Sequence, residues 1–110
     1  MHTRQTISEK QVENYLVDRV RAAGGVAEKT ASPGRRGYFD RVVALPGGRV
    51  IFVEVKKPRG WHMPLHQRAR HKLYRDLGCE VAVVKTIADV DSLIDRPGGV
   101  DRETVTSKPG

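Results

Sequence analysis

The stretch YFDRVVALPGGRVIFVEVK, residues 38–56, decides the fold of this chain. Residues 38–45 and 49–56 are rich in β-branched and aromatic side chains, which is typical of strands. The segment between them, Pro-Gly-Gly at 46–48, has the residue types of a tight turn. The stretch therefore predicts a β-hairpin.

The length of the turn sets which residues of the hairpin meet. If the turn holds three residues, Leu45 faces Arg49, and counting outward sets Asp40 opposite the residue at 54. That residue is Glu54, and Lys56 points to the same face because strand side chains alternate with period two. A two-residue Gly-Gly turn would instead shift the register by one and put the carboxylates on different faces.

The predicted pair of carboxylates has a chemical consequence. Opposite Cβ atoms lie about 5 Å apart, and two carboxylates at that distance repel unless a positive charge lies between them. A hard divalent cation such as Mg²⁺ suits oxygen ligands, and Mn²⁺ could replace it. Lys56 could neutralise the pair, orient a water or stabilise a developing oxyanion. The alternative interpretation is that Asp40 is a loop residue and Glu54–Lys56 a pair on a strand surface.

The composition describes a small soluble domain with an anionic partner. The chain has 110 residues, 38% hydrophobic and 30% charged, and a formal net charge of +7. Such a charge favours nucleic acid as partner. The single cysteine, Cys79, excludes an internal disulfide and a Cys-rich zinc site, and it fits a reducing cytoplasm. No apolar run is long enough for a membrane span or placed as a signal peptide, so we expect a cytoplasmic protein.

Periodicity and helix-end signals predict the remaining elements. Ser8 and Gln11 have the form of a capping box, and Gly24-Gly25 ends the first helix. The expected elements are, in order, a helix at 8–23, strands at 26–30, 38–45 and 49–56, a helix at 64–77, a strand at 80–85 and a helix at 86–94. This order predicts an α/β sandwich with a mixed sheet, formed by residues 8–95 between a flexible leader (1–7) and a disordered tail (96–110).

The first helix carries two acidic residues among its apolar ones. At 100° per residue, Glu9 and Glu13 fall inside the arc of Val12, Leu16, Val17, Val20 and Ala23. A carboxylate on a buried face costs free energy unless it is paired or binds a metal. Glu9 has a simple explanation, since acids are favoured in a first helical turn. Glu13 is the better candidate ligand, with a salt bridge as its alternative.

The second helix has an apolar stripe of its own, formed by Leu65, Ala69, Leu73 and Leu77, which we expect to be buried. Gln67 lies off this stripe and should be exposed. The histidines at 62, 66 and 71 do not have the spacing of a zinc protease, and we expect them to face DNA or solvent. Trp61, in the loop before the helix, could stack on a base or cover the edge of a core.

Basic residues are concentrated in two places. From residue 56 to residue 75 there are seven Lys or Arg, three His and no carboxylate, and Arg41 joins a second group near Asp40. We expect phosphate contacts from Arg35, Arg36, Lys57, Arg59, Arg68 and Lys72.

These residues resemble a known family. Gly37-Tyr38-Phe39-Asp40, Glu54-Val55-Lys56 and Gln67 in a Pro-Leu-His-Gln context look like the VRR-NUC branch of the PD-(D/E)xK nucleases, in its small stand-alone phage and bacterial form. The likeness runs from about residue 9 to residue 94. One departure is Phe39, where the family usually has proline.

The resemblance implies a fold, a site and an activity. The fold would be a restriction-endonuclease-like core. Asp40, Glu54 and the carbonyl of Val55 would hold the metal, joined by Glu13 or Glu9. Lys56 would position or activate the attacking water, and Gln67 would support the site.

The implied activity is that of a Mg²⁺-dependent, structure-selective DNA endonuclease. It would act on branched DNA such as a Holliday junction, as a homodimer, in a bacterial or phage-infected cell. A non-catalytic DNA-binding module with the same fold is the alternative, and RNA as substrate is a third possibility.

Overall fold

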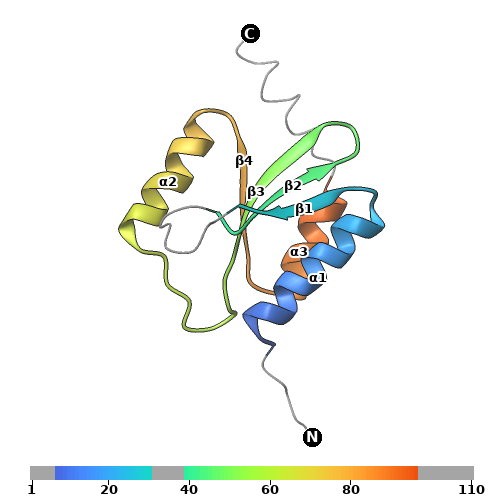
Figure 1. The fold of residues 1–110 in the computed structure, drawn as a ribbon. Coiled ribbons are helices and arrows are strands. Elements are labelled where there is room, and N and C mark those ends of the chain that lie inside the picture. Colours follow the sequence, from blue (N-terminus) through green and yellow to red (C-terminus); the bar gives the residue numbers. More distant parts are fainter. Residues whose placement is uncertain (1–6, 31–38, 97–110) are drawn as a thin grey trace, which may run out of the picture.

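The computed structural model describes residues 7–30 and 39–96 (Figure 1). The order of elements, α-β-β-β-α-β-α, is the one predicted from the sequence. The elements are α1 (Glu9–Ala22), β1 (Val26–Lys29), β2 (Arg41–Leu45), β3 (Arg49–Val55), α2 (Leu65–Asp76), β4 (Glu80–Val84) and α3 (Ile87–Asp95).

The four strands form one mixed sheet in the order β1-β2-β3-β4. β1 with β2 and β2 with β3 are antiparallel, whereas β3 and β4 are parallel. Leu45 faces Arg49 across a turn at 46–48, so the predicted three-residue turn and its register are confirmed. β2 is shorter than expected and begins at Arg41. Asp40 precedes it, and its backbone N–H still donates to the carbonyl of Val53 at 3.0 Å.

One face of the sheet is covered by α1 and α3 and forms the apolar core. Alternate residues of the central strands point to this side, as the pleat requires. They pack against α1 and α3, which also contact each other through Tyr15, whose hydroxyl donates to Asp91 at 2.6 Å. The fully or almost fully buried members of this core are Val12, Leu16, Val20, Val43, Ile51, Val53, Val55, Val84, Val90 and Leu93.

The ends of α1 follow the sequence signals. Ser8 and Gln11 form the predicted capping box, with both reciprocal hydrogen bonds present. After the helix, Gly24 adopts a φ of 90°, a conformation that favours glycine. Gly25 is needed for a different reason, because a Cβ there would lie 2.2 Å from the carbonyl oxygen of Ala44 on β2. Ala23, expected on the buried arc, is exposed.

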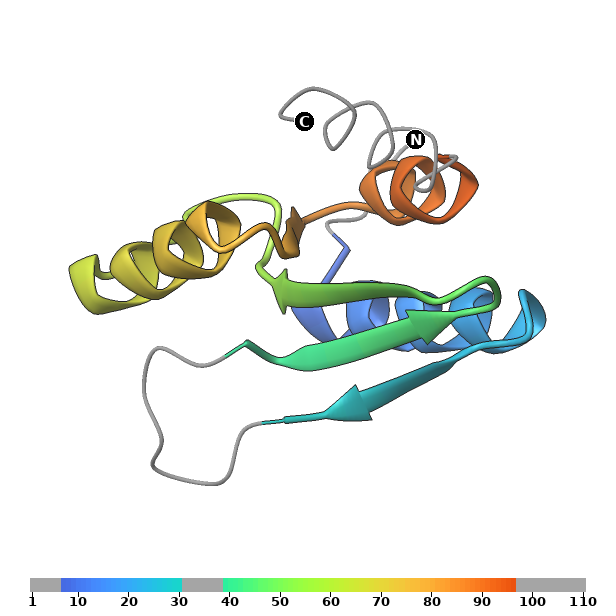
Figure 2. The ribbon, with the colours of Figure 1, turned by 90° about the horizontal axis from the view of Figure 1, so that it is seen from above.

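The other face of the sheet is covered in part by α2, which stands apart from α1 and α3 (Figure 2). Beneath α2 lies an aromatic cluster of Phe39, Phe52, His71 and Tyr74. The ring of Phe39 stacks on His71 at 4.8 Å, and Tyr74 lies edge-on to Phe39 at 5.2 Å and to Phe52 at 5.0 Å. His71 is therefore buried, and the prediction that it faces DNA or solvent was wrong.

The orientation of α2 also reverses the prediction for its apolar stripe. Leu65, Leu73 and Leu77 are 79%, 49% and 71% exposed, and Ala69 is exposed as well. Gln67, expected to be exposed, is buried. The helix turns its polar and aromatic face to the sheet. Gln67 contacts Glu54 of β3, and His71 and Tyr74 pack on Phe39 and Phe52, so the leucines point away from the sheet.

The edge position of β4 limits its burial. Of its five residues only Val84 is buried. Its first residue, Glu80, accepts two hydrogen bonds from the largely buried Arg49, at 3.0 and 2.7 Å, which join the start of β4 to the start of β3. Bidentate pairs of this kind are strong and geometrically specific.

Most of the expected leader and tail lies outside the described residues. Two residues at their inner ends are engaged with the domain: Ile7 packs against the core, and the carbonyl of Arg96 accepts a hydrogen bond from Arg49 at 3.1 Å. None of the helices in residues 7–30 and 39–96 combines the length and hydropathy that crossing a membrane requires.

Candidate active site

Asp40 and Glu54 lie at the open end of the hairpin, on the side of the sheet that α2 covers. Asp40 directly precedes β2, and its carboxylate Oδ2 accepts a hydrogen bond from the backbone N–H of Val55 at 2.8 Å. This bond fixes the Asp40 side chain against the end of β3. Glu54, one residue before Val55, is only 4% exposed. The register predicted from the turn therefore brings the two carboxylates to one place.

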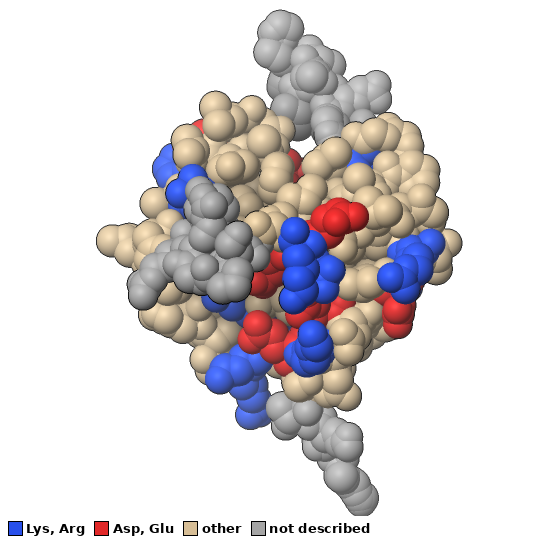
Figure 3. Space-filling view, in the orientation of Figure 1, with Lys and Arg blue, Asp and Glu red and all other residues tan. Residues whose placement is uncertain are grey.

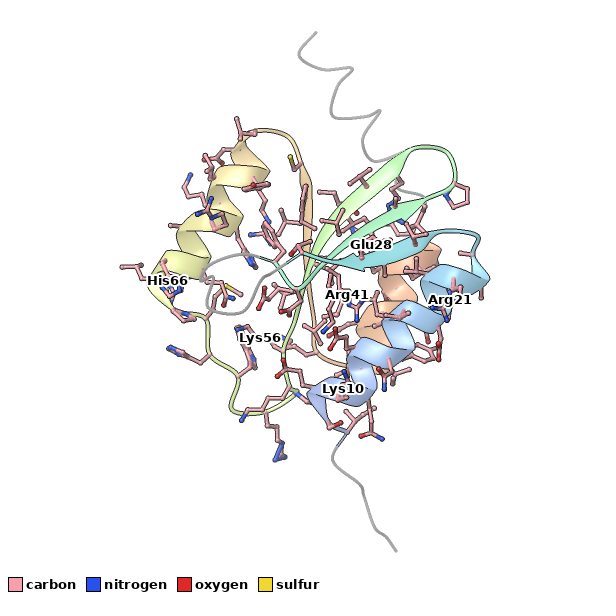
Figure 4. The ribbon with its side chains drawn as sticks, in the orientation of Figure 1. Lys10, Arg21, Glu28, Arg41, Lys56 and His66 are labelled. Atoms are coloured by element: carbon pink, nitrogen blue, oxygen red, sulfur yellow. The ribbon has the colours of Figure 1, made fainter. Side chains whose placement is uncertain are left out.

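Gln67 joins Lys56 to Glu54. The ammonium of Lys56 donates to Oε1 of Gln67 at 2.9 Å, and Nε2 of Gln67 donates to Oε2 of Glu54 at 2.8 Å. The Lys56 ammonium also lies 3.5 Å from the same Glu54 oxygen. Only one orientation of the amide presents an acceptor to the ammonium and a donor to the carboxylate, so the network fixes all three side chains. Lys56 lies between α2 and α1 in Figure 4.

Both carboxylates have raised pKa values. Burial raises the pKa of Glu54 to about 7, with the charge of Asp40 as the second cause, and the charge and hydrogen bonds of Lys56 and Gln67 oppose the shift only in part. Burial is also the main cause that raises the pKa of Asp40, partly offset by the hydrogen bond from Val55. Each carboxylate thus lies in an environment that disfavours its charge.

The residues present fit a divalent cation. Oε1 of Glu54 is buried and has no hydrogen-bond partner, although a buried carboxylate oxygen normally has one. A cation between Glu54 and Asp40 would satisfy this oxygen and offset the charge of Asp40, which is the second cause of the raised pKa of Glu54. In residues 7–30 and 39–96 no group of three or more His, Cys, Asp or Glu side chains could hold a metal. In the conformation described, such a cation would have Asp40 and Glu54 as its carboxylates, with backbone oxygen and water as its further ligands.

The helix glutamates occupy different environments. Glu13 forms a close ion pair with Arg41, whose Nε and Nη2 both lie 2.9 Å from Oε2 of Glu13. This is the alternative anticipated for Glu13, and it removes Arg41 from the expected basic group around Asp40. The charge of Glu13 nevertheless contributes to the raised pKa of Asp40, so the two lie near each other. Glu9 is exposed in the first turn of α1.

The expected phosphate-binding residues are distributed unevenly. Lys57 and Arg59 are exposed in the loop between β3 and α2. Arg68 is exposed but donates to the carbonyl of Met63 at 3.3 Å, and Lys72 pairs with Asp76 at 2.7 Å. Arg35 and Arg36 lie outside the described residues. Figure 3 shows acidic side chains with Lys and Arg around them in the middle of the face between α1 and α2.

The sequence did not reveal the roles of three residues beneath α2: Phe39, His71 and Tyr74. Phe39 packs beneath α2 and holds the chain directly before Asp40, which gives the family's usual proline position a packing role here. His71 lies one helical turn after Gln67, and Tyr74 a further turn on. This i, i+4, i+7 spacing was the available signal, because it marks the face that Gln67 shares.

Comparisons with known proteins identify relatives of the whole chain. No family model matches the chain. Over 88 residues it is 44% identical to "Putative nuclease p44" of Acyrthosiphon pisum secondary endosymbiont phage 1, a match that spans 80% of this chain and 92% of that protein. A solved structure described as "VRR_NUC domain" is similar with a TM-score of 0.74 and 38% identity, over 81% of this chain and 96% of the other.

The mixed sheet, with Asp40, Glu54, Lys56 and Gln67 gathered at one end of its hairpin, defines an α/β domain of the restriction-endonuclease-like type. The phage relative and the solved structure identify the family within that class. The chain belongs to the VRR-NUC domain family of nucleases. The family and the fold class expected from the sequence are thus confirmed.

Proposed function

We propose that this protein is a metal-dependent endonuclease that hydrolyses phosphodiester bonds in DNA and selects branched DNA. The observation that carries the proposal is the environment of Glu54, whose carboxylate is buried beside that of Asp40 with one oxygen unpartnered. A module that only bound DNA would have no use for two desolvated carboxylates where a phosphate must approach. The nuclease name of the phage relative supports the same conclusion.

The roles of the residues follow from their contacts. Asp40, Glu54 and the carbonyl of Val55 would hold a Mg²⁺ or Mn²⁺ ion, which when bound lowers the pKa of water and neutralises charge on the phosphate. Lys56 is held in place by Gln67 and can donate a hydrogen bond to an oxygen of the attacking group or the phosphate. Glu13 or Glu9 would add a carboxylate from α1.

Glu13 is the better of these two helix residues. Its charge already acts on Asp40, whereas Glu9 is exposed. Its ion pair with Arg41 would have to open for Glu13 to reach a metal. A Glu13→Gln variant that cuts as fast as the wild type would exclude it as a ligand.

The exposed positive charge around the site supports DNA as the substrate. Lys57 and Arg59 are exposed on the loop that joins Lys56 to α2, so they can contact phosphates that flank the cleaved bond. Arg35, Arg36, Arg68 and Lys72 would extend this contact. Binding should therefore weaken as the salt concentration rises.

A cleavage assay tests the proposal. The protein is incubated with four-way junctions, flapped and linear duplexes and RNA, with Mg²⁺, with Mn²⁺ and with EDTA. We expect cutting only with metal, fastest on branched DNA, and lost in Asp40→Asn while binding persists. Binding without cutting in either metal would instead support the DNA-binding module.

The exposed leucines of α2 support a homodimer. Each subunit has one site, whereas both strands of a junction must be cut. Leu65, Leu73 and Leu77 form an apolar strip on the outer side of α2, and a second copy could cover it. Light scattering should give twice the subunit mass for the wild type and the subunit mass for Leu73→Glu/Leu77→Glu. An unchanged mass in that variant would exclude this face as the interface.

A further inference from the structure

Trp61 is an exposed aromatic side chain that belongs to neither packed cluster of the molecule. It is 41% exposed. It is not one of the rings that pack beneath α2, and it is not among the partly buried side chains that pack against the core in the described part of the chain. The expectation that it covers the edge of a core therefore does not apply.

Lys85 holds the indole ring of Trp61 in place. The ammonium of Lys85 lies over the ring, 4.6 Å from its centroid, a distance typical of a cation–π contact. The backbone of Lys85 is itself fixed, since its N–H donates to Oδ2 of Asp89 at 2.8 Å, at the capping box that starts α3. A flat apolar surface is thus supported by the rigid part of the domain.

This ring lies at the same edge of the sheet as the candidate active site. β3 and β4 are parallel, and Val55 pairs with Val84 at their carboxyl ends. The backbone N–H of Lys56 donates to the carbonyl of Val84 at 3.0 Å, so Lys56 and Lys85 leave the sheet side by side. Trp61 rests on the second lysine, and Lys57 and Arg59 lie in its own loop. Charge for phosphate and a surface for a base are therefore adjacent.

We propose that Trp61 is the stacking site for an unpaired base of the DNA, next to the phosphate that is cut. One face of the ring meets Lys85, and the exposed remainder can receive a nucleobase. Every base has an apolar face, so such a contact is independent of sequence but requires a base that is not stacked in a duplex. The inference rests on the proposed function and names the residue by which the enzyme would distinguish branched or single-stranded DNA from duplex.

Intrinsic fluorescence tests the contact directly, because Trp61 is the only tryptophan of the chain. The full chain in metal-free buffer with EDTA is titrated with a duplex that carries a single-stranded flap, and with a blunt duplex of equal length. We expect the flap to quench the tryptophan emission and the blunt duplex to bind without quenching. Equal quenching by both would overturn the proposal.

Variants then measure the contribution to binding. Trp61→Ala should weaken flap binding between about 5-fold and about 150-fold, the value of one stacked base, and leave blunt-duplex binding within about 2-fold. Trp61→Phe should restore most of the loss, and Lys85→Met should give a smaller loss on the flap alone. Val26→Ala, another exposed apolar side chain, is the matched control. Equal weakening on both DNAs in Trp61→Ala would show that the ring does not select unpaired bases.

These readouts separate the inference from the proposed function. Binding and quenching are measured without metal, so they do not depend on cleavage. A wild type that quenches with the flap but cuts no DNA would leave Trp61 as a stacking site and refute the nuclease mechanism. A wild type that cuts, with Trp61→Ala cutting flapped and blunt DNA in the same ratio, would refute only the stacking site.

Discussion

The two faces of the sheet bury different kinds of side chain. The face under α1 and α3 buries apolar side chains, such as Leu16 and Ile51, and meets the ordinary requirements of a stable core. The face under α2 buries Glu54, Gln67 and His71, and it leaves both ring nitrogens of His71 without partners. Burying such groups costs free energy. One face of the sheet therefore stabilises the domain, while the other gives up stability to hold a site.

The largest expected effect lies on the apolar face. Leu16→Ala should lower the free energy of unfolding by about 2–5 kcal/mol, because Leu16 is fully buried and its removal leaves a cavity. That is a large part of the stability of a small domain. Urea unfolding measures it. Leu65→Ala, at 79% exposure, is the matched control and should cost less than about 0.5 kcal/mol in the monomer. Similar losses in both would contradict the assignment of the core.

On the α2 face the expected effect is on activity rather than stability. Glu54→Gln should reduce cleavage at least about 100-fold, more than the loss usual for a residue that only orients a ligand. The fold should remain and its stability should not fall, since a neutral amide replaces a carboxylate that burial disfavours. Steady-state cleavage and urea unfolding of the same preparation give both values. A variant that loses stability and activity together would argue for a purely structural Glu54.

A smaller loss is expected at the residue that positions the others. Gln67→Ala removes the amide that is hydrogen-bonded to both Lys56 and Glu54 and should lower cleavage about 10- to 100-fold. Because Gln67 orients groups rather than holding the metal, raising the Mg²⁺ concentration should recover part of the rate. His66→Ala changes the neighbouring, exposed residue and should cut normally. Full activity in Gln67→Ala would show that the network is not needed.

The smallest effect is a pH dependence in which two groups oppose each other. Burial raises the pKa of Glu54 from 4.5 to about 7, so its contribution to stability is lost as the pH rises through that range. Burial also lowers the pKa of His71 from 6.5 to about 4, so its contribution is lost as the pH falls through that range. In metal-free wild type the two trends offset each other over most of this range.

Single variants should separate these trends. Glu54→Gln should leave a protein whose stability rises with pH between about 4 and 6.5, opposed in part by the raised pKa of Asp40. His71→Phe should leave one whose stability falls between 4.5 and about 7, reinforced by the raised pKa of Asp40. Thermal unfolding across that pH range in EDTA measures both. Parallel curves for the two variants would mean that the buried groups do not titrate as described.

Local sequence signals predicted much of this fold. The capping box at Ser8, the turn at 46–48 and the order of elements are set by neighbouring residues, and the structure has all of them. Once the turn is known to hold three residues, the position of Asp40 opposite Glu54 follows by counting. These features can be predicted without knowing how the helices pack on the sheet.

Tertiary choices could not be predicted in the same way. Periodicity identified the Leu65–Leu77 stripe of α2 but not that the opposite face, with Gln67 and His71, would meet the sheet. The sequence of a single helix does not determine which of its faces packs on the sheet. Glu13 likewise could not be assigned from its helix alone, because its partner Arg41 comes from a strand 28 residues away.

The close approach of Gly25 to the Ala44 carbonyl determines what a mutation at Gly25 would do. Any side chain at Gly25 would have to push that carbonyl away, and the peptide plane that carries it belongs to β2. Ala44 lies on β2 and Asp40 directly precedes this strand, so a displacement of that peptide plane would shift the strand that follows Asp40. Gly25 is not one of the charged residues of the site. A mutation there should nevertheless produce a temperature-sensitive protein.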